Sequence, residues 1–409
     1  MKSAFGSKGD RKDNLIAEDL TRREFLKAGV GSAAVICGLE MFAGCATTET
    51  PKVMPHVYPL LPYNKVQPPQ EGCLVGLFRM SAMVYDRVFR DKLIEITNRA
   101  RNVDEFVEMF KKEKGFFEGV MEKYRIADTI AFYKNALGAK PFIFAPDFST
   151  DLYSPFPMAN ASVVAKNGMV PFIRSEIGSL FNKQISATRL GLGEIARGQY
   201  DGYIKEFAQG ATKFGKEQGS FFFTTMIELN ADWWYWGQKR DLIPAWRRIW
   251  QIFEDQGANQ YATWVWVIYN PYGVSMVVDD PERYYPGDGY VDWIGINTFS
   301  NNTNPYAPDQ NASLNQLMDG ICRQMHKKHP EKPIMLSMFG RANGHDQPRW
   351  LINAYRSIRN DFPEVKAAIH YDLNQKVFDR YWTDSTLTPE SVQTLKEIFK
   401  DPYWIMARM

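Results

Sequence analysis

The sequence predicts a single (β/α)₈ barrel, and two observations carry this prediction. Eight short apolar runs recur between residue 71 and residue 409, and amphipathic stretches separate them. Runs of this kind are typical of strands buried on both faces of a parallel sheet, and the stretches between them are typical of covering helices. Eight strands that alternate with helices over this length match the size of a barrel domain.

The eight predicted strands are short, and all are rich in aliphatic and aromatic residues. They are Leu74–Phe78, Phe142–Ala145, Val170–Ile173, Phe221–Met226, Ala262–Ile268, Val291–Ile296, Ile334–Leu336 and Val365–His370.

Three of the intervening stretches carry an apolar stripe with helical spacing and sensible start and stop signals. They are Ile204 to Phe214, ended by Gly219; Trp246 to Phe253, entered at Pro244 and closed by Gly257; and Trp350 to Ile358. A doubly wound open sheet is the alternative, but no glycine-rich phosphate loop follows the first predicted strand. The stretch from Asp86 to Ala139 is longer than one crossover requires, so we expect a helical elaboration of the barrel rim there.

Composition and charge give no reason to expect a nucleic-acid partner or a bound metal ion. With 409 residues, of which 45% are apolar and 14% aromatic, the chain can bury one large core. Its net charge of +2 and the lack of charged blocks give no reason to expect nucleic acid. The five histidines and four cysteines show no metal-ligand spacing. We therefore expect a monomer without a metal or other cofactor.

Residues 1–45 have the layout of a twin-arginine export signal. Arg22 and Arg23 precede the mostly small and apolar run from Ala28 to Leu39. That run is shorter than the roughly 20 apolar residues that a membrane-spanning helix needs. We expect the signal to be removed after export to the periplasm or the cell surface.

The signal ends in a sequence that resembles a lipobox, Phe42-Ala43-Gly44-Cys45. This predicts that the chain is cut before Cys45 and held on a membrane by a lipid on that cysteine. Ala46 follows the cysteine where an aspartate is associated with inner-membrane retention, which favours the outer membrane. The alternative is an ordinary cleaved signal in which Cys45 is incidental.

Residues 46–70 contain six prolines and little periodicity, which predicts a semi-extended linker between the lipid and the barrel of residues 71–409. Two cysteines remain in the barrel. Cys322 lies on an apolar helical stripe and is expected to be a buried small hydrophobe. A disulfide from Cys322 to Cys73 stays open, because an exported protein folds in an oxidising compartment.

Polar and aromatic side chains gather where the predicted strands end, which is where barrels carry their chemistry. Flat aromatic surfaces beside carboxylates and amides suit a sugar ring, whose C–H faces stack on rings while its hydroxyls need polar partners. The strand-end residues are Asp147 and Phe148; Arg174 and Glu176; Glu228, Asn230, Asp232, Trp233, Trp234 and Trp236; Tyr269, Asn270 and Tyr272; Asn297 and Phe299; Met338 and Arg341; and His370, Tyr371 and Asp372.

Three blocks within this order resemble the family 26 glycoside hydrolases, whose best-known members are endo-β-mannanases. They are Glu228-Leu229-Asn230-Ala231-Asp232-Trp233, Tyr285-Pro286-Gly287-Asp288 and Pro333-Ile334-Met335-Leu336. With weaker matches, the resemblance extends over residues 74 to 375 in the family's order. It implies a polysaccharide or oligosaccharide ligand. The predicted glycan-contacting residues are Glu176, Asn230, Trp233, Trp234, Trp236, Tyr269, Trp293, Phe299 and Tyr371.

The resemblance also implies a mechanism that this chain does not match. Family members cleave β-linked glycans with retention, using an acid/base after the fourth strand and a nucleophile after the seventh. Glu228 aligns with the acid/base, but Met338 stands at the nucleophile position. A thioether carries no negative charge and cannot form the glycosyl ester through which that mechanism passes.

Two neighbouring positions depart from the family pattern together with Met338. Ile227 stands where a histidine usually precedes the acid/base, and Phe299 stands where a tyrosine usually supports the nucleophile. Both changes remove a polar group and keep bulk. Left opposite a thioether, those polar groups would each cost about 1–3 kcal/mol if unsatisfied. The three changes together predict an apolar sub-pocket.

Two functions of different classes follow. The first is a glycan-binding protein that has kept the groove and lost the chemistry. The second is an active endo-β-mannanase or β-glycanase in which Glu228 works with another carboxylate, about 6.5–9.5 Å away if the reaction inverts. Asp372 is the first substitute to test, because it follows the strand beside that of Met338. Glu176, Asp147 and Asp232 are further candidates.

Overall fold

The computed structural model shows a barrel together with part of the segment that precedes its first strand. The described residues are 58–59, 61–62, 64–79, 92, 95–96, 99, 105, 108–109, 112–113, 115–116, 125–146, 150–151, 155–176, 192–231, 239–272, 278–300, 312–343, 346–373 and 384–407. Arg22, Arg23 and Cys45 lie outside them, so export and lipidation remain predictions.

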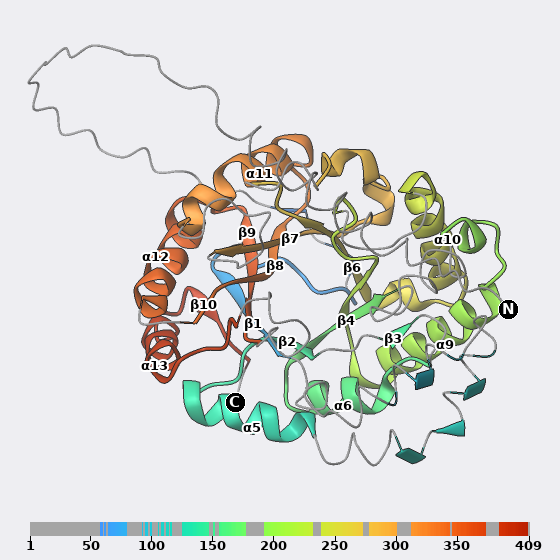
Figure 1. The fold of residues 1–409 in the computed structure, drawn as a ribbon, viewed down its shortest axis with the longest axis horizontal. Helices are drawn as coiled ribbons and strands as arrows, with labels where there is room; N and C mark the ends of the chain where they lie inside the picture. The colour runs from blue at the N-terminus through green and yellow to red at the C-terminus, as the bar shows by residue number, and fades with distance from the viewer. Residues whose placement is uncertain are drawn as a thin grey trace, which may run out of the picture. The chain divides into compact units, whose positions relative to one another are not determined.

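Eight parallel strands close into a barrel, as the sequence predicts (Figure 1). Each strand pairs with the next, and the last returns to the first in the register Leu74↔Ala367 to Phe78↔Tyr371. This closure excludes the doubly wound alternative. The strands are β1 Cys73–Arg79, β2 Ile143–Pro146, β4 Val170–Glu176, β5 Phe221–Thr225, β6 Ala262–Tyr269, β7 Trp293–Ser300, β8 Ile334–Arg341 and β9 Val365–Tyr371, with the short β3 Thr150–Asp151 beside β4 and β10 Trp404–Ile405 beside β1.

Helices surround the strands (Figure 1), and the three predicted stripes are confirmed as buried helix faces. α10 begins two residues before Pro244, because proline is tolerated in a first helical turn. The helices are α5 Ile126–Leu137, α6 Met158–Lys166, α8 Leu192–Ala196, α9 Asp201–Gln218, α10 Leu242–Asp255, α11 Leu314–Lys328, α12 Gln347–Asn360 and α13 Pro389–Ile398, with 3₁₀ turns η2 Lys239–Asp241, η3 Ala258–Gln260, η4 Pro281–Tyr284 and η5 Asp288–Tyr290. No helix within these described ranges is long and apolar enough to cross a membrane.

The residues just before β1 pack against the N-terminal ends of the barrel strands. Val66 is buried in the same apolar cluster as the barrel interior. Its N–H donates to Thr263 Oγ1 at 2.8 Å, and its carbonyl accepts from the Trp293 indole at 3.4 Å. This segment therefore covers the end of the barrel opposite to the strand carboxyl ends.

Two further contacts hold the same segment. Lys65 Nζ forms an ion pair with Asp292 Oδ2 at 2.6 Å, and both side chains are largely buried. Tyr58 donates its hydroxyl to the carbonyl of Glu364 at 3.1 Å. The linker predicted for residues 46–70 is therefore too long, since its last part belongs to the folded body. The prolines keep this part extended, but they do not keep it from packing.

Both barrel cysteines are buried and free, so the structure contains no disulfide between Cys73 and Cys322. Cys322 lies on the buried face of α11, as predicted. Its thiol donates to Glu364 Oε1 at 3.2 Å.

His370 lies in the layer between the strands and the helices. Its neighbours Ile369 and Tyr371 belong to the barrel interior, so the alternation of β9 turns His370 outward. The ring meets Phe339 edge-on at 5.5 Å and is fully buried. Neither ring nitrogen has a hydrogen-bond partner among the described residues. Burial lowers the pKa of His370 to about 3.

Acid should therefore destabilise the fold through His370. The folded pKa is about 3, whereas an unfolded histidine titrates near 6.5, so the unfolded state takes up the proton first as the pH falls. Stability should decline by about 1.4 kcal/mol per pH unit below pH 6.5 on account of this group. Urea unfolding of wild type and His370→Leu at pH 7 and pH 4.5 tests this. An equal loss in both proteins would assign the acid sensitivity elsewhere.

Candidate active site

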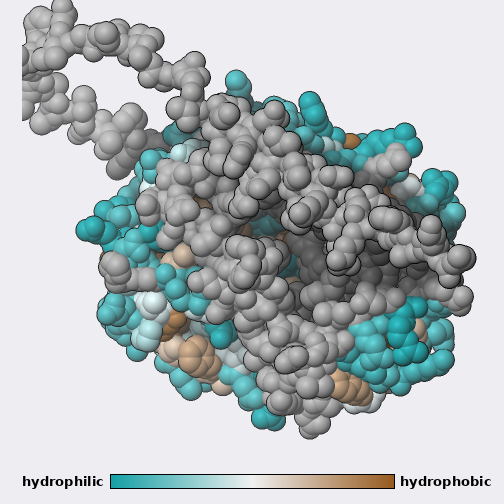
Figure 2. All heavy atoms as spheres, in the orientation of Figure 1, coloured by the Kyte–Doolittle hydropathy of each residue, from teal (hydrophilic) through white to brown (hydrophobic). Residues whose placement is uncertain are grey.

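The candidate site lies inside the barrel at the carboxyl ends of the strands. Met338 comes from β8, Asn297 and Phe299 from β7, Tyr371 from β9 and Arg174 from β4. Hydrophilic side chains make up much of the described outer surface in the same view (Figure 2). The strand order brings together residues that are up to about 200 positions apart in the chain.

Glu228 is held in a tight turn just past β5. Its φ of 52° and that of Met226, 57°, lie in the left-handed region that side chains other than glycine seldom adopt. The Glu228 N–H donates to the carbonyl of Val267 at 2.9 Å, which fixes the turn to β6. Such strain concentrates at functional sites, where the surrounding structure keeps a side chain in one place.

The Glu228 carboxylate is oriented by side chains from β7 and β8. Asn297 Nδ2 donates to Glu228 Oε1 at 2.8 Å. Asn297 Oδ1 in turn accepts from the Ser337 hydroxyl at 2.7 Å, which fixes the orientation of the amide. Glu228 is 6% exposed, so the carboxylate is largely buried.

Met338 lies in an apolar cluster, as the joint changes at 227, 299 and 338 predict. Buried Ile227 and Tyr371 belong to the same cluster, and Phe299 packs against it. Met338 is 6% exposed. Arg174 Nη1 donates a hydrogen bond to its thioether sulfur at 3.5 Å.

Several stacked groups lie in the same apolar cluster as Met338 or contact it. The Arg174 guanidinium lies 4.8 Å over the ring of Phe78, and Phe78 stacks on Tyr371 at 5.1 Å with 8° between the planes. Phe299 meets Tyr371 edge-on at 5.0 Å and lies 6.4 Å from Tyr269. The sequence analysis missed Phe78, although it is the inward residue nearest the end of β1.

Asn230 supports the site without facing it. Its Nδ2 donates to the carbonyl of Tyr269 at 2.9 Å, and its Oδ1 accepts from the Tyr269 N–H at 2.9 Å. Nδ2 also lies 3.2 Å from the carbonyl of Asp279. The Asn230 amide therefore holds the backbone around Tyr269. This arrangement does not support a direct contact between Asn230 and a glycan, and it indicates that Asn230 positions Tyr269.

Asp372 is engaged in structural contacts. Its Oδ2 pairs with Arg79 Nη1 at 2.7 Å, and its Oδ1 accepts from the Leu387 N–H at 3.0 Å. Burial raises the pKa of Asp372, an effect that Arg79 and the Leu387 N–H partly offset. Both carboxylate oxygens therefore hold neighbouring chain, which weakens the case for Asp372 as a substitute base.

The remaining predicted residues divide into two groups. Trp293 is the first residue of β7 and meets Phe222 edge-on at 5.4 Å with no exposure. It lies at the opposite end of the barrel, so its position does not support a contact with glycan. The backbone of Glu176 ends β4. Its side chain, together with Asp147, Asp232, Trp233, Trp234 and Trp236, lies outside the described residues.

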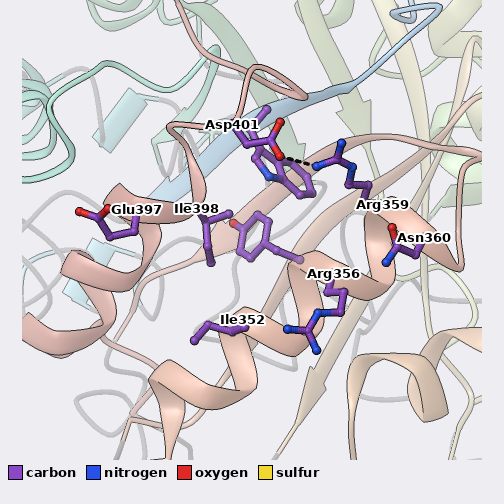
Figure 3. Close-up of a pocket in the computed structure, with 9 residues that line it drawn as sticks. Ile352, Arg356, Arg359, Asn360, Glu397, Ile398 and Asp401 are labelled. Atoms are coloured by element: carbon purple, nitrogen blue, oxygen red, sulfur yellow. Dashed lines mark hydrogen bonds and ion pairs between the residues drawn. The ribbon is translucent and has the colours of Figure 1, made fainter.

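A hollow lies on the outside of the barrel between α12 and α13 (Figure 3). It has a volume of about 390 Å³ and is lined by Ile352, Arg356 and Ile398 among others. Arg359 and Asp401 form an ion pair at its edge. Within the described part of the chain, no group of three or more His, Cys, Asp or Glu side chains could hold a metal ion, here or at the strand ends.

Comparison with known proteins relates the barrel to one glycoside hydrolase family. Residues 192–405 match the model of Glycosyl hydrolase family 26. The chain is 29% identical over 195 residues to Endoglucanase H of Acetivibrio thermocellus, a match that covers 45% of this chain and 20% of that protein. It is 21% identical over 215 residues to Mannan endo-1,4-beta-mannosidase A and B of Caldalkalibacillus mannanilyticus, covering 50% of this chain and 36% of that protein. The chain thus spans only a minor part of these relatives.

Solved structures share the fold. GH26C from Muricauda sp. MAR_2010_75 matches with a TM-score of 0.52 and 16% identity over 82% of this chain and 87% of that one. The Bacillus subtilis mannanase BCman matches with a TM-score of 0.51 and 14% identity over 82% and 87% of the two chains. At these identities the likeness concerns the barrel architecture.

Proposed function

Because the chain belongs to glycosyl hydrolase family 26, we propose that it binds a β-linked glycan of mannan type and does not hydrolyse it by the family's two-carboxyl route. The observation that carries this proposal is the apolar packing of Met338. The two relatives described above, an endoglucanase and a mannan endo-1,4-beta-mannosidase, support the glycan class.

The loss of chemistry follows from what surrounds position 338. A retaining hydrolase needs a carboxylate there to form the glycosyl ester, and the thioether of Met338 cannot take that part. Ile227 and Phe299 pack with it in one apolar cluster. Residual hydrolysis is expected to be lower by several orders of magnitude, as when one member of a catalytic unit is removed.

Glycan binding is supported by the aromatic residues that line the strand ends. Tyr269 and the partly buried Phe299 lie 6.4 Å apart at the strand ends, and Tyr272 is 43% exposed just past β6. Asn270 holds that rim, since its Oδ1 accepts from the Tyr272 N–H at 3.0 Å. Rings of this kind stack on the C–H faces of sugars.

The alternative is an active hydrolase of altered mechanism. The feature that favours it is Glu228, which the sequence resemblance aligns with the family's acid/base and which accepts a hydrogen bond from Asn297. A second carboxylate would have to act as base. Asp372 is tied to Arg79 and Leu387, so this role would fall on a group other than the first one predicted.

Glu228→Gln separates the two functions, because glutamine keeps the shape and the hydrogen bond from Asn297 but cannot donate a proton as an acid. For a chain beginning at Met54, we expect binding of β-mannan and glucomannan within about five-fold of wild type, because a neutral isostere keeps most contacts. We expect no reducing ends from either protein. Affinity electrophoresis and a reducing-end assay measure the two quantities. Turnover in wild type that Glu228→Gln abolishes would replace the binding function by the hydrolase.

The proposal includes the cellular address that the sequence predicts. Export by the twin-arginine route and acylation of Cys45 would hold the barrel on a membrane, with the outer membrane favoured. Metabolic labelling with a clickable fatty acid, compared between wild type and Cys45→Ser, tests the anchor. Equal labelling of both proteins would leave Cys45 incidental.

A further inference from the structure

Strand β8 carries one residue more than the strands beside it, just before position 338. Against β7, the register moves from Ile296↔Leu336 directly to Asn297↔Met338, so Ser337 is the extra residue. The register against β9 shifts in the same stretch of β8. This is the pattern of a β-bulge, which re-aims side chains and is common beside active sites.

The bulge turns two successive side chains of β8 into the barrel. Met338 belongs to the apolar cluster of the barrel interior. Ser337 faces inward as well, since its hydroxyl donates to Asn297 Oδ1 at 2.7 Å. Gly295 leaves room for that hydroxyl, because a Cβ at this glycine would lie 2.9 Å from Ser337 Oγ. In a regular strand, successive side chains face opposite sides, and only one of the two could reach the site.

Ser337, Asn297 and Glu228 form a buried chain of hydrogen bonds. Asn297 Nδ2 donates to Glu228 Oε1 at 2.8 Å, while Asn297 Oδ1 accepts from the Ser337 hydroxyl. Asn297 is fully buried and Ser337 is 2% exposed, so water has little access to replace the hydroxyl. Without it, Asn297 Oδ1 would lose its donor, and the amide would no longer be held against the Glu228 carboxylate.

A carboxylate recognises a sugar hydroxyl by accepting a hydrogen bond, and such charge-assisted bonds are short and depend on geometry. On the premise that the site binds a glycan, which is the proposed function, we infer that Ser337 is a positioning residue for ligand binding. Through Asn297 it keeps the Glu228 carboxylate where that group accepts hydrogen bonds from glycan hydroxyls. This role does not require a carboxylate at position 338.

Ser337→Ala tests the role in the chain that begins at Met54. We expect its affinity for β-mannan and glucomannan to fall about ten-fold, the size of one hydrogen bond to a charged group. In a Glu228→Ala background, the same change should alter affinity by about two-fold or less, because no carboxylate remains to be placed. Ser391→Ala is the matched control and should leave affinity unchanged. That buried hydroxyl also donates to an amide oxygen, Gln347 Oε1 at 2.5 Å, but it lies between α12 and α13.

The side-chain amide of Asn297 gives a second readout that needs no ligand. In protein carrying isotope-labelled asparagine, its nuclear magnetic resonance signal is assigned by its loss in Asn297→Asp. Hydrogen exchange of this amide should be about ten-fold faster or more in Ser337→Ala than in wild type, because the amide is less firmly held. The rate in Ser391→Ala should equal that of wild type.

The outcomes separate the positioning role from the function on which it rests. Unchanged affinity or unchanged amide exchange in Ser337→Ala, with glycan binding by wild type intact, would overturn the role of Ser337 and leave the binding function standing. An equal loss of affinity in the Glu228→Ala background would also overturn it, since the effect would not pass through the carboxylate. Absence of binding by wild type would overturn both. Circular dichroism of each variant shows whether a lost affinity reflects the site or a lost fold.

Discussion

A chain that begins at residue 71 should be less stable than one that begins at Met54 by about 3–5 kcal/mol. The shorter chain loses the burial of Val66, worth roughly 1.5–2 kcal/mol. It also leaves the Thr263 hydroxyl and the Trp293 indole without the partners that Val66 supplies. Water can replace part of these two hydrogen bonds, so together they are expected to add about 1–3 kcal/mol. Urea unfolding followed by tryptophan fluorescence measures the difference.

The ion pair between Lys65 and Asp292 adds to this effect. Asp292 Oδ2 accepts from Lys65 Nζ and from the Trp264 N–H at 2.8 Å, so losing Lys65 leaves a largely buried carboxylate with only the neutral donor. Lys65→Met in the longer chain isolates this contribution. Phe132→Ala, at a position that is 57% exposed on α5, serves as the control and should change stability little. Equal midpoints for the two chain lengths would show that the segment only rests on the barrel.

The covering segment shows where sequence reasoning about the fold stopped. The strands could be predicted because runs such as Ala262–Ile268 are apolar throughout, which marks burial on both faces. Prolines and weak periodicity correctly predict an extended segment before residue 71. They cannot predict that Val66 packs, because its partners Thr263 and Trp293 are about 200 residues away.

In the candidate site, too, some features could be predicted from local sequence and others depend on distant strands. Glu228 and Met338 could be placed from local motifs and strand order. The stacking of Phe78 on Tyr371 could not, since the two strands meet only because β9 closes on β1. Trp293 was predicted to contact glycan because it lies on a strand whose other end carries Asn297 and Phe299, and its full burial does not support that contact. Its place at the first residue of β7 indicates that it lies at the opposite end of the barrel from the strand carboxyl ends.

Met338→Glu should create hydrolysis of glucomannan at about 100-fold or more above the assay background that wild type gives, a fraction of what a complete catalytic pair provides. The new carboxylate would lie beside Arg174, whose Nη1 now contacts the residue at 338. An adjacent guanidinium favours the ionised form that attacks the sugar. Glu228 is already fixed by Asn297 for the acid/base part.

The gain should remain partial, because Phe299 cannot donate a hydrogen bond to the new group. Met338→Glu combined with Phe299→Tyr should therefore exceed the single variant, while neutral Met338→Gln should show no turnover. Reducing-end release and product mass spectrometry follow the reaction. If Met338→Glu folds and binds glycan but releases no products, the glycosidic bond does not lie between positions 228 and 338. The groove would then have lost the register of a hydrolase as well as its nucleophile, and the change at 338 would follow from a different mode of binding.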